Sequence, residues 1–197
     1  MELVKKIIIG LAIYVFLIAF LVLFLNQVIA LDEYLFLLIY NSSNTYLFEF
    51  FNIITYFGSS LAWILLIVIF WLKSKKKLSL QLLFAFVVDT VLLLFLKNVF
   101  LRTRPFEKYH LATSFDFDIG ASFPSGHSQR AFSGAVILAN HYKKYQLIFY
   151  VLATLVSFSR IYIGLHFPLD TIIGAINGII LGIIVLTIPT KKIEKAI

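Results

Sequence analysis

Long apolar segments occupy most of this chain and restrict it to one class of fold. They extend over Ile7–Leu25, Asn52–Leu72, Leu78–Phe100, Ser128–Tyr142, Tyr145–Leu165 and Pro168–Ile188. Most approach the ~20 residues that an α-helix needs to cross a bilayer, although the fourth is short. Only 14% of the 197 residues are charged, against roughly 25% in an ordinary soluble domain. The sequence therefore predicts an all-α integral membrane protein, a six-transmembrane-helix bundle.

The same pattern leaves little room for anything except this bundle. Because the spans use almost the whole chain, we expect a single domain over residues 1–197. The segment Ile7–Leu25 follows "MELVKK", but its apolar core exceeds the ~7–15 residues of a signal peptide. We therefore expect it to be a span. The chain has no cysteine, which excludes disulfides and thiolate chemistry.

The lysines indicate how the bundle is oriented. The net charge is +7, and the lysines at every second junction between spans are Lys5, Lys6, Lys73, Lys75, Lys76, Lys77, Lys143, Lys144, Lys191, Lys192 and Lys195. By the positive-inside rule that side is cytoplasmic. We expect both termini inside, a multi-pass protein of the plasma (inner) membrane, and no nucleic-acid partner. The outer segment Leu31–Tyr40 is too short to cross and is predicted to lie in the interface.

A second set of polar residues gathers at the predicted outer ends of the spans: Lys97, Arg102, Arg104, Ser125, His127, Arg130, Arg160, His166 and Asp170. Ionisable groups at membrane depth are costly and are candidates for a functional site. An antiparallel pair of spans would return His166 to the face from which His127 leaves. The sequence thus predicts one outer pocket at the ends of the third to sixth spans.

Helix polarity gives this pocket an affinity for anions. The fourth and sixth spans would both direct their amino-terminal N–H groups and positive dipole ends into it. In "PSGHS" the glycine lets the backbone approach a ligand and Ser125 adds a hydroxyl donor, as in a phosphate cradle. In "HFPLD", Asp170 can bond one imidazole nitrogen of His166 and leave the other free to react. A phosphate site is the prediction.

Three blocks of sequence carry a family resemblance. They are "KNVFLRTRP" at Lys97–Pro105, "PSGH" at Pro124–His127 and "SRIYIGLHFPLD" at Ser159–Asp170. In this order and spacing they resemble the type 2 phosphatidic acid phosphatase family of membrane lipid phosphatases, which is similar to the vanadium haloperoxidases. The signature covers residues 97–170, whereas the first two spans rest on hydropathy alone.

The resemblance implies phosphoryl transfer without metal or other cofactor, through a phosphohistidine. His166 would be the nucleophile, oriented by Asp170. His127 would protonate the leaving oxygen and then activate water. The phosphoryl oxygens would be held by Lys97, Arg104, Ser125, Gly126 and Arg160. Fixed cations and helix ends can neutralise the charge on the equatorial oxygens, which is the main catalytic requirement of this reaction.

The sequence restricts the substrate less than it restricts the reaction. A polyprenyl diphosphate such as undecaprenyl diphosphate is favoured, and phosphatidylglycerophosphate, phosphatidic acid and lipid A phosphate stay open. A nonenzymatic lipid or anion transporter using the same basic pocket is the alternative. A vanadate-dependent oxidant enzyme is disfavoured by the membrane embedding.

Some polar and small residues have structural interpretations. Asp89 is expected to bond Asn177 or a serine of a neighbouring helix. Glycines at every fourth position, namely Gly174, Gly178 and Gly182, predict close helix packing. Three cations beside the signature positions would touch a second phosphate or lipid head groups; these are Arg102, Lys108 and Arg130.

Overall fold

The computed structural model describes residues 12, 15–16, 28–111 and 120–188, and all regular secondary structure in these residues is helical. A helical segment covers residues 28–41. The helices that follow are α2 (Thr45–Ile54), η1 (Thr55–Gly58), α3 (Ser60–Leu72), α4 (Lys76–Phe100), α5 (Pro105–Lys108), α6 (Gly126–His141), η2 (Lys143–Tyr145), α7 (Gln146–Tyr162) and α8 (Pro168–Thr187). This confirms the all-α class of the described chain.

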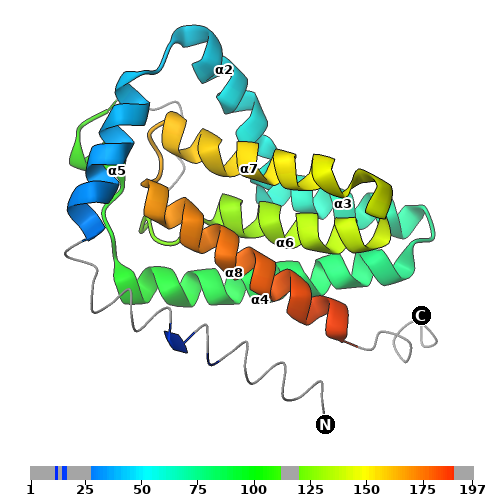
Figure 1. The fold of residues 1–197 in the computed structure, drawn as a ribbon. Helices are drawn as coiled ribbons and strands as arrows, with labels where there is room; N and C mark the ends of the chain where they lie inside the picture. The colour runs from blue at the N-terminus through cyan, green and yellow to red at the C-terminus, as the bar shows by residue number, and fades with distance from the viewer. Residues whose placement is uncertain (1–11, 13–14, 17–27, 112–119, 189–197) are drawn as a thin grey trace.

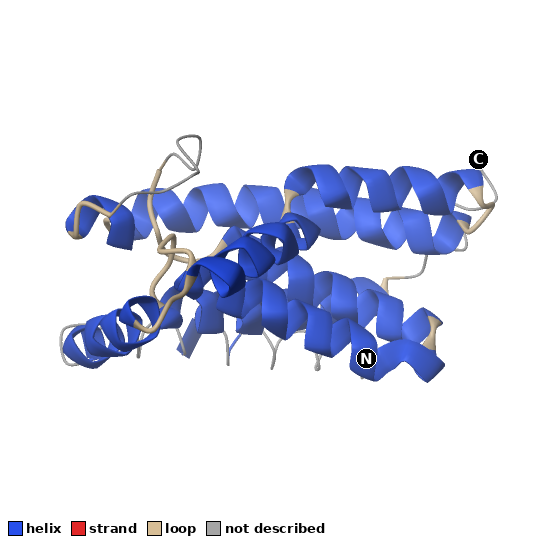
Figure 2. Ribbon diagram, turned by 90° about the horizontal axis from the view of Figure 1, so that it is seen from above, coloured by secondary structure: helices blue, strands red, loops and turns tan. Residues whose placement is uncertain are grey.

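Helix α6 lies at the centre of the bundle and packs against α4, α7 and α8 (Figure 1). Consecutive long helices run in opposite directions (Figure 1). The view from above shows these helices side by side and joined by loops (Figure 2). The core between α3, α4, α6 and α8 is filled by Trp63, Leu78, Leu82, Ala85, Ile137, Leu181 and Val185. The chain reversals at Lys73–Lys75 and Lys143–Tyr145 therefore form one end, the lysine end.

The opposite end holds all three signature blocks, at residues 97–105, 124–127 and 159–170, and we call it the signature end. Helices α4 and α7 finish there, and α6 and α8 begin there. The predicted antiparallel return of His166 to the face of His127 is thus confirmed. The sequence could predict this because each intervening helix crosses the bundle once.

Within the described residues, the helices match some of the predicted spans in length and fall short of others. Three regions of the described chain are long and apolar enough to cross a membrane: Lys76–Lys108, Lys143–Tyr162 and Pro168–Thr187. A fourth would be the bent pair Thr45–Gly58 and Ser60–Leu72. Helix α6 has only 16 residues. The predicted span Ile7–Leu25 lies outside the described residues.

The predicted second span, Asn52–Leu72, is not one continuous helix. The chain bends by 51° between Gly58 and Ser60, where the Oγ of Ser59 accepts a hydrogen bond from the N–H of Ala62 at 3.2 Å. An N-cap serine of this kind starts a new helix. A Cβ atom on Gly58 would lie 2.9 Å from the carbonyl oxygen of His127. The bend therefore brings backbone against the start of α6.

The glycines of α8 form its contact with α6, as predicted. A Cβ atom on Gly178 would lie 2.1 Å from the carbonyl oxygen of Gln129, and one on Gly174 would lie 2.5 Å from that of Ser125. Real Cβ atoms do not approach backbone so closely. Close packing of these two helices holds the second and third signature blocks together.

We expect Gly178→Ala to destabilise the protein by about 1–3 kcal/mol, because the added methyl must push α8 away from the α6 backbone. Alanine is intrinsically better than glycine inside a helix by about 1 kcal/mol, so a loss of stability would come from packing. Thermal unfolding in detergent measures it. Ile172→Ala on the exposed face of α8 is the control, and an equal loss in both variants would contradict this account.

The segment 28–41 crosses the signature end of the bundle instead of running along it (Figure 1). Its outward face is apolar or aromatic and carries Leu31, Tyr34, Leu35 and Leu38, all exposed. Its inward face buries Asp32 and Phe36, and Phe36 contacts the rings of Tyr109 and Phe167. A helix with leucines outside and a carboxylate inside suits an apolar surrounding, in agreement with the predicted interfacial position.

Candidate active site

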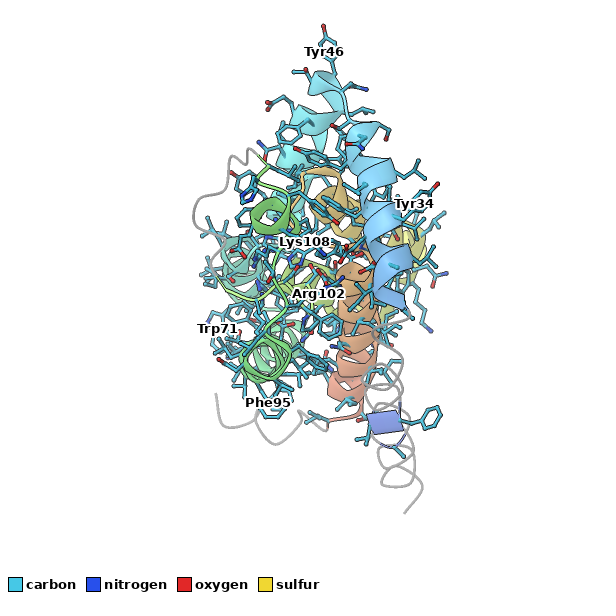
Figure 3. The ribbon with its side chains drawn as sticks, turned by 90° about the vertical axis from the view of Figure 1, so that its left-hand side faces the viewer. Tyr34, Tyr46, Trp71, Phe95, Arg102 and Lys108 are labelled. Carbon is cyan, nitrogen blue, oxygen red and sulfur yellow. The ribbon has the colours of Figure 1, made fainter. Side chains whose placement is uncertain are left out.

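The signature end brings the predicted site residues of four helices together. Lys97 lies in the last turn of α4, and Arg104 follows on the stretch before α5. Ser125, Gly126 and His127 form the start of α6. Arg160 lies in the last turn of α7, His166 lies in the turn after this helix, and Asp170 is in the first turn of α8. Polar side chains gather around Arg102 in the view onto this end (Figure 3).

His166 lies between a carboxylate and a guanidinium. Its Nδ1 lies 3.4 Å from Oδ2 of Asp170, and its Nε2 lies 3.5 Å from NH1 of Arg104. A guanidinium can only donate, so Nε2 must present its lone pair and Nδ1 must carry the proton in the neutral ring. His166 is buried at 2% exposure. The ring thus has its basic nitrogen directed at a cation, where a phosphoryl group would also be attracted.

Arg104 is fixed beside this nitrogen by backbone oxygens. Its Nε donates to the carbonyl of Gly120 at 2.8 Å and its NH1 to that of Leu165 at 3.3 Å. The side chain is only 1% exposed. A buried guanidinium held in this way gives a preorganised charge for an oxyanion.

Arg160 organises the turn that carries His166. Its carbonyl oxygen accepts the N–H groups of Leu165 and His166, both at 3.0 Å, and its NH1 donates to Oγ1 of Thr55 at 2.9 Å. The turn passes through Gly164 at a φ of 82°, which L side chains rarely adopt. The three-residue step from α7 to His166 is thereby fixed.

His127 occupies the first turn of α6, where it interacts electrostatically with Arg160, His166 and Arg104. The backbone of Gly58 packs against it from the bend before α3. Among the predicted catalytic residues it is the one with a partly exposed side chain. Its position between cations and beside the second imidazole permits proton transfer to a bound group.

The start of α6 supplies donors to the same space. The Oγ of Ser125 is buried and has no hydrogen-bond partner among the described residues, and Ser125 makes no side-chain cap bond to α6. The first N–H groups of a helix lack intrahelical partners. The Nζ of Lys97 donates to the carbonyl of Ala121. The region around Ser125 can thus accept an anion.

The start of α8 differs from the prediction that both helix ends would bind a ligand anion. The N–H of Leu169 donates to Oδ1 of Asp32 at 2.7 Å, and the N–H of Phe167 donates to Oδ2 of Asp170 at 2.9 Å. These carboxylates are the anions at this helix end. Of the two helix ends, the start of α6 therefore stays the candidate for binding a ligand anion.

Ser122 and Asp32 were not assigned to the site from sequence, and Arg102 was placed in the pocket without its carboxylate partners. Ser122 donates from Oγ to Oδ2 of Asp170 and lies 3.4 Å from Nδ1 of His166. Arg102 donates from NH1 to Oδ1 of Asp170 and from NH2 to Oδ2 of Asp32, both at 2.6 Å. Burial raises the pKa of Asp32, and the charge of Arg102 offsets this only in part. No periodic pattern marks these positions.

The flanking cations pair with protein groups, which neither sequence alternative foresaw. Arg102 joins two carboxylates, as described above. Lys108 pairs with Glu33, which also accepts from the hydroxyl of Tyr109 at 3.0 Å. Burial alone would raise the pKa of Glu33, but these hydrogen bonds lower it on balance.

The prediction that Asp89 bonds Asn177 or a serine was wrong. Its Oδ2 lies 3.3 Å from Nε of Arg130, and NH1 of Arg130 donates to Oγ of Ser60 at 2.9 Å. Asn177 instead donates to Oε1 of Gln129 at 3.4 Å. A buried carboxylate prefers a cation when one is within reach, because an ion pair offsets more of the desolvation cost.

No group of three His, Asp or Glu side chains in the described chain could hold a metal ion.

Known proteins are similar to this chain in sequence. Undecaprenyl-diphosphatase of Sulfolobus acidocaldarius is 35% identical over 150 residues, which cover 71% of each chain. The bacitracin transport permease protein BcrC of Bacillus licheniformis is 31% identical over 123 residues, 60% of this chain and 61% of that protein.

Solved structures agree with these similarities. The PAP2-type phosphatidylglycerolphosphate phosphatase of Bacillus subtilis superposes with a TM-score of 0.76 at 28% identity, over 95% of this chain and 96% of that one. LpxE of Aquifex aeolicus gives a TM-score of 0.69 at 35% identity, over 80% and 96%. The sequence profile of the PAP2 superfamily matches residues 78–194. The resemblance seen in the three blocks is thus confirmed, and the chain belongs to the PAP2 superfamily.

Proposed function

We propose that this protein is a membrane lipid phosphatase that removes the terminal phosphate of a polyprenyl diphosphate such as undecaprenyl diphosphate. The observation that carries the proposal is the setting of His166, with Nδ1 on Asp170 and Nε2 beside Arg104. The similarity to an undecaprenyl-diphosphatase favours the diphosphate over phosphatidylglycerophosphate, phosphatidic acid or a lipid A phosphate.

In the first step, Nε2 of His166 attacks the terminal phosphorus. The bond from phosphorus to the bridging oxygen breaks, and the lipid monophosphate leaves with a proton from His127. Asp170 holds the Nδ1 proton and stabilises the charge that the ring acquires. Arg104, Arg160 and Lys97 would neutralise the equatorial oxygens together with the Ser125 hydroxyl and the N–H of Gly126.

In the second step, His127 removes a proton from water, which attacks the phosphohistidine. The bond from phosphorus to Nε2 breaks and inorganic phosphate leaves, so both imidazoles return to their starting states. The side chain of His127 is partly exposed whereas that of His166 is buried, which supports its role at the side from which water arrives.

The membrane arrangement belongs to the same proposal. Residues 1–197 would form one domain with six spans, both termini cytoplasmic and the signature end on the extracytoplasmic side of the plasma (inner) membrane. The lysines at the opposite end support this orientation. The bilayer and the lipid substrate are the partners.

We expect phosphate release from undecaprenyl diphosphate by the detergent-purified protein, with no loss of rate in excess chelator, because protein cations occupy the place that Mg²⁺ has in other phosphoryl transfers. Phosphate release is measured across the diphosphate, undecaprenyl phosphate, phosphatidylglycerophosphate, phosphatidic acid and a lipid A phosphate. Loss of rate that added Mg²⁺ restores would exclude the metal-free reaction. A preference for another lipid would change the substrate and leave the chemistry in place.

The transport alternative is favoured by one observation, the similarity to a protein described as a bacitracin transport permease. It predicts movement of lipid across proteoliposomes without phosphate release, and unchanged movement in His166→Ala. Release of phosphate that stops in this variant decides for the enzyme.

A further inference from the structure

Asp32 comes from a segment that carries none of the signature blocks, yet its carboxylate is buried at the active site. It is 3% exposed, while its neighbours Leu31 and Tyr34 point outward. A carboxylate is costly to bury unless it is paired and hydrogen-bonded. Its contacts therefore identify what the segment 28–41 contributes.

Both oxygens of Asp32 are used. Oδ1 accepts the N–H of Leu169 in the first turn of α8 at 2.7 Å, and Oδ2 accepts NH2 of Arg102 at 2.6 Å. One carboxylate thus ties the segment 28–41 to the helix that carries Asp170 and to the stretch between α4 and α5. Figure 3 labels Arg102 at this junction, beside the segment 28–41 and α8.

Arg102 continues the connection to the catalytic acid. Its NH1 donates to Oδ1 of Asp170 at 2.6 Å, and the guanidinium packs over the ring of Phe167 at 4.2 Å from the centroid. A planar guanidinium can hold two carboxylates through separate nitrogens, which an ammonium cannot do in the same geometry. Oδ1 of Asp170 is thereby fixed, and Oδ2 faces Nδ1 of His166.

Asp32 is what holds Arg102 in this orientation from the outer side. The Arg102 side chain is 15% exposed, whereas Asp32 and Asp170 are 3% and 0% exposed. Without the Asp32 charge, the guanidinium would have one carboxylate partner and a route to water. Oδ1 of Asp170 would then be held less firmly, and the carboxylate would depend on the bonds that its Oδ2 accepts from Ser122 and from the N–H of Phe167.

We propose that Asp32 is a positioning residue for the phosphatase reaction, acting through Arg102 on Asp170 and so on the ring of His166. This inference rests on the proposed function. It assigns to the interfacial segment 28–41 a part in catalysis, in addition to covering the end of the bundle.

The neighbouring residue Glu33 provides a matched control. It lies on the same segment, and its carboxylate pairs with Lys108 and the hydroxyl of Tyr109. Glu33→Gln weakens the attachment of the segment while the hydrogen bonds that Arg102 donates to Asp32 and Asp170 stay in place. Asp32→Asn keeps the shape of the side chain and removes its charge.

The test uses the full-length protein in detergent, with undecaprenyl diphosphate or whichever lipid of the panel the wild type hydrolyses. We expect Asp32→Asn to lower kcat by roughly 10- to 100-fold with little change in KM, since a displacement of about 1 Å at the reacting groups can cost about 100-fold. Arg102→Lys should lose a similar factor. Asp32→Glu, which restores the carboxylate, should recover part of the rate, and Glu33→Gln should stay close to wild type.

The double variant distinguishes positioning from separate structural effects. If Asp32 acts through Arg102, Asp32→Asn adds little to the loss in Arg102→Lys. Wild-type kcat in Asp32→Asn, equal losses in Asp32→Asn and Glu33→Gln, or additive losses in the double variant would each overturn the proposal. Should Asp32→Asn fail to fold, wild-type kcat in a folded Arg102→Lys would overturn it, and a loss of kcat at unchanged KM would support it. Absence of phosphate release from the wild type would instead count against the proposed function.

Discussion

Replacing His166 by alanine is expected to reduce phosphate release to background, a loss of roughly 10⁴-fold or more, as for other covalent nucleophiles. The reason is the position of Nε2, whose lone pair faces Arg104 at 3.5 Å while Nδ1 is held by Asp170. No other described imidazole has a carboxylate on one nitrogen and a cation on the other. Phosphate release from undecaprenyl diphosphate in detergent measures the loss.

His141→Ala is the matched control for this variant, because it removes an imidazole at the lysine end, where Nε2 bonds Gln81 at 2.7 Å. It should leave the rate nearly unchanged. Acid-labile phosphate bound to the protein after brief mixing with labelled substrate should be present in wild type and absent in His166→Ala. Retention of turnover by a folded His166→Ala protein would rule out the covalent route.

The second large effect is expected for His127→Ala, with a loss of about 10²–10⁴-fold in phosphate release, the usual contribution of a general acid or base. The size of the loss should depend on the substrate. When a diphosphate is cleaved, the leaving group is a lipid monophosphate, which is a stable anion. When phosphatidic acid is cleaved, the leaving group is an alkoxide, which depends more strongly on protonation. We therefore expect the larger loss for phosphatidic acid.

The two steps can be separated in this variant. Because His127 also activates water, the phosphohistidine should accumulate with undecaprenyl diphosphate when its breakdown becomes slow. The labelled-protein measurement described for His166 detects it. An equal loss for both leaving groups, together with no accumulation, would assign His127 to binding and not to proton transfer.

The described helices α4, α7 and α8 could be predicted closely, since each is one apolar run that ends at charged or turn residues. The break before α3 was missed because the run from Asn52 to Leu72 stays apolar across it. The local signal was nevertheless present in the Gly58–Ser59 pair, where a small residue precedes an N-cap. Hydropathy averages over such a signal, whereas cap chemistry does not.

The site, like the fold, could be predicted only in part. The residues of the three blocks could be placed together because each block lies at the end of a helix that crosses the bundle once. Asp32 and Ser122 could not, since they lie outside the blocks in stretches without a period, and their contacts with Arg102, Leu169 and Asp170 join residues 48 to 137 positions apart. Arg102 lies inside the first block, but its pairing with Asp32 and Asp170 could not be predicted from the sequence. The pairing of Asp89 with Arg130 could not be predicted either. Which side chains of two neighbouring helices meet depends on how each helix is rotated about its axis, and the sequence pattern does not give this rotation.

The brevity of α6 affects how a lipid could reach the site. A helix of 16 residues is about 24 Å long, and the hydrocarbon layer is about 30 Å thick. With His141 and the neighbouring lysines level with the head groups of one leaflet, the PSGH turn would sit several ångströms beneath the head groups of the other. A long-chain substrate could then tip its phosphates downward into the protein while its tail stays among the surrounding acyl chains, and extraction from the bilayer would be unnecessary.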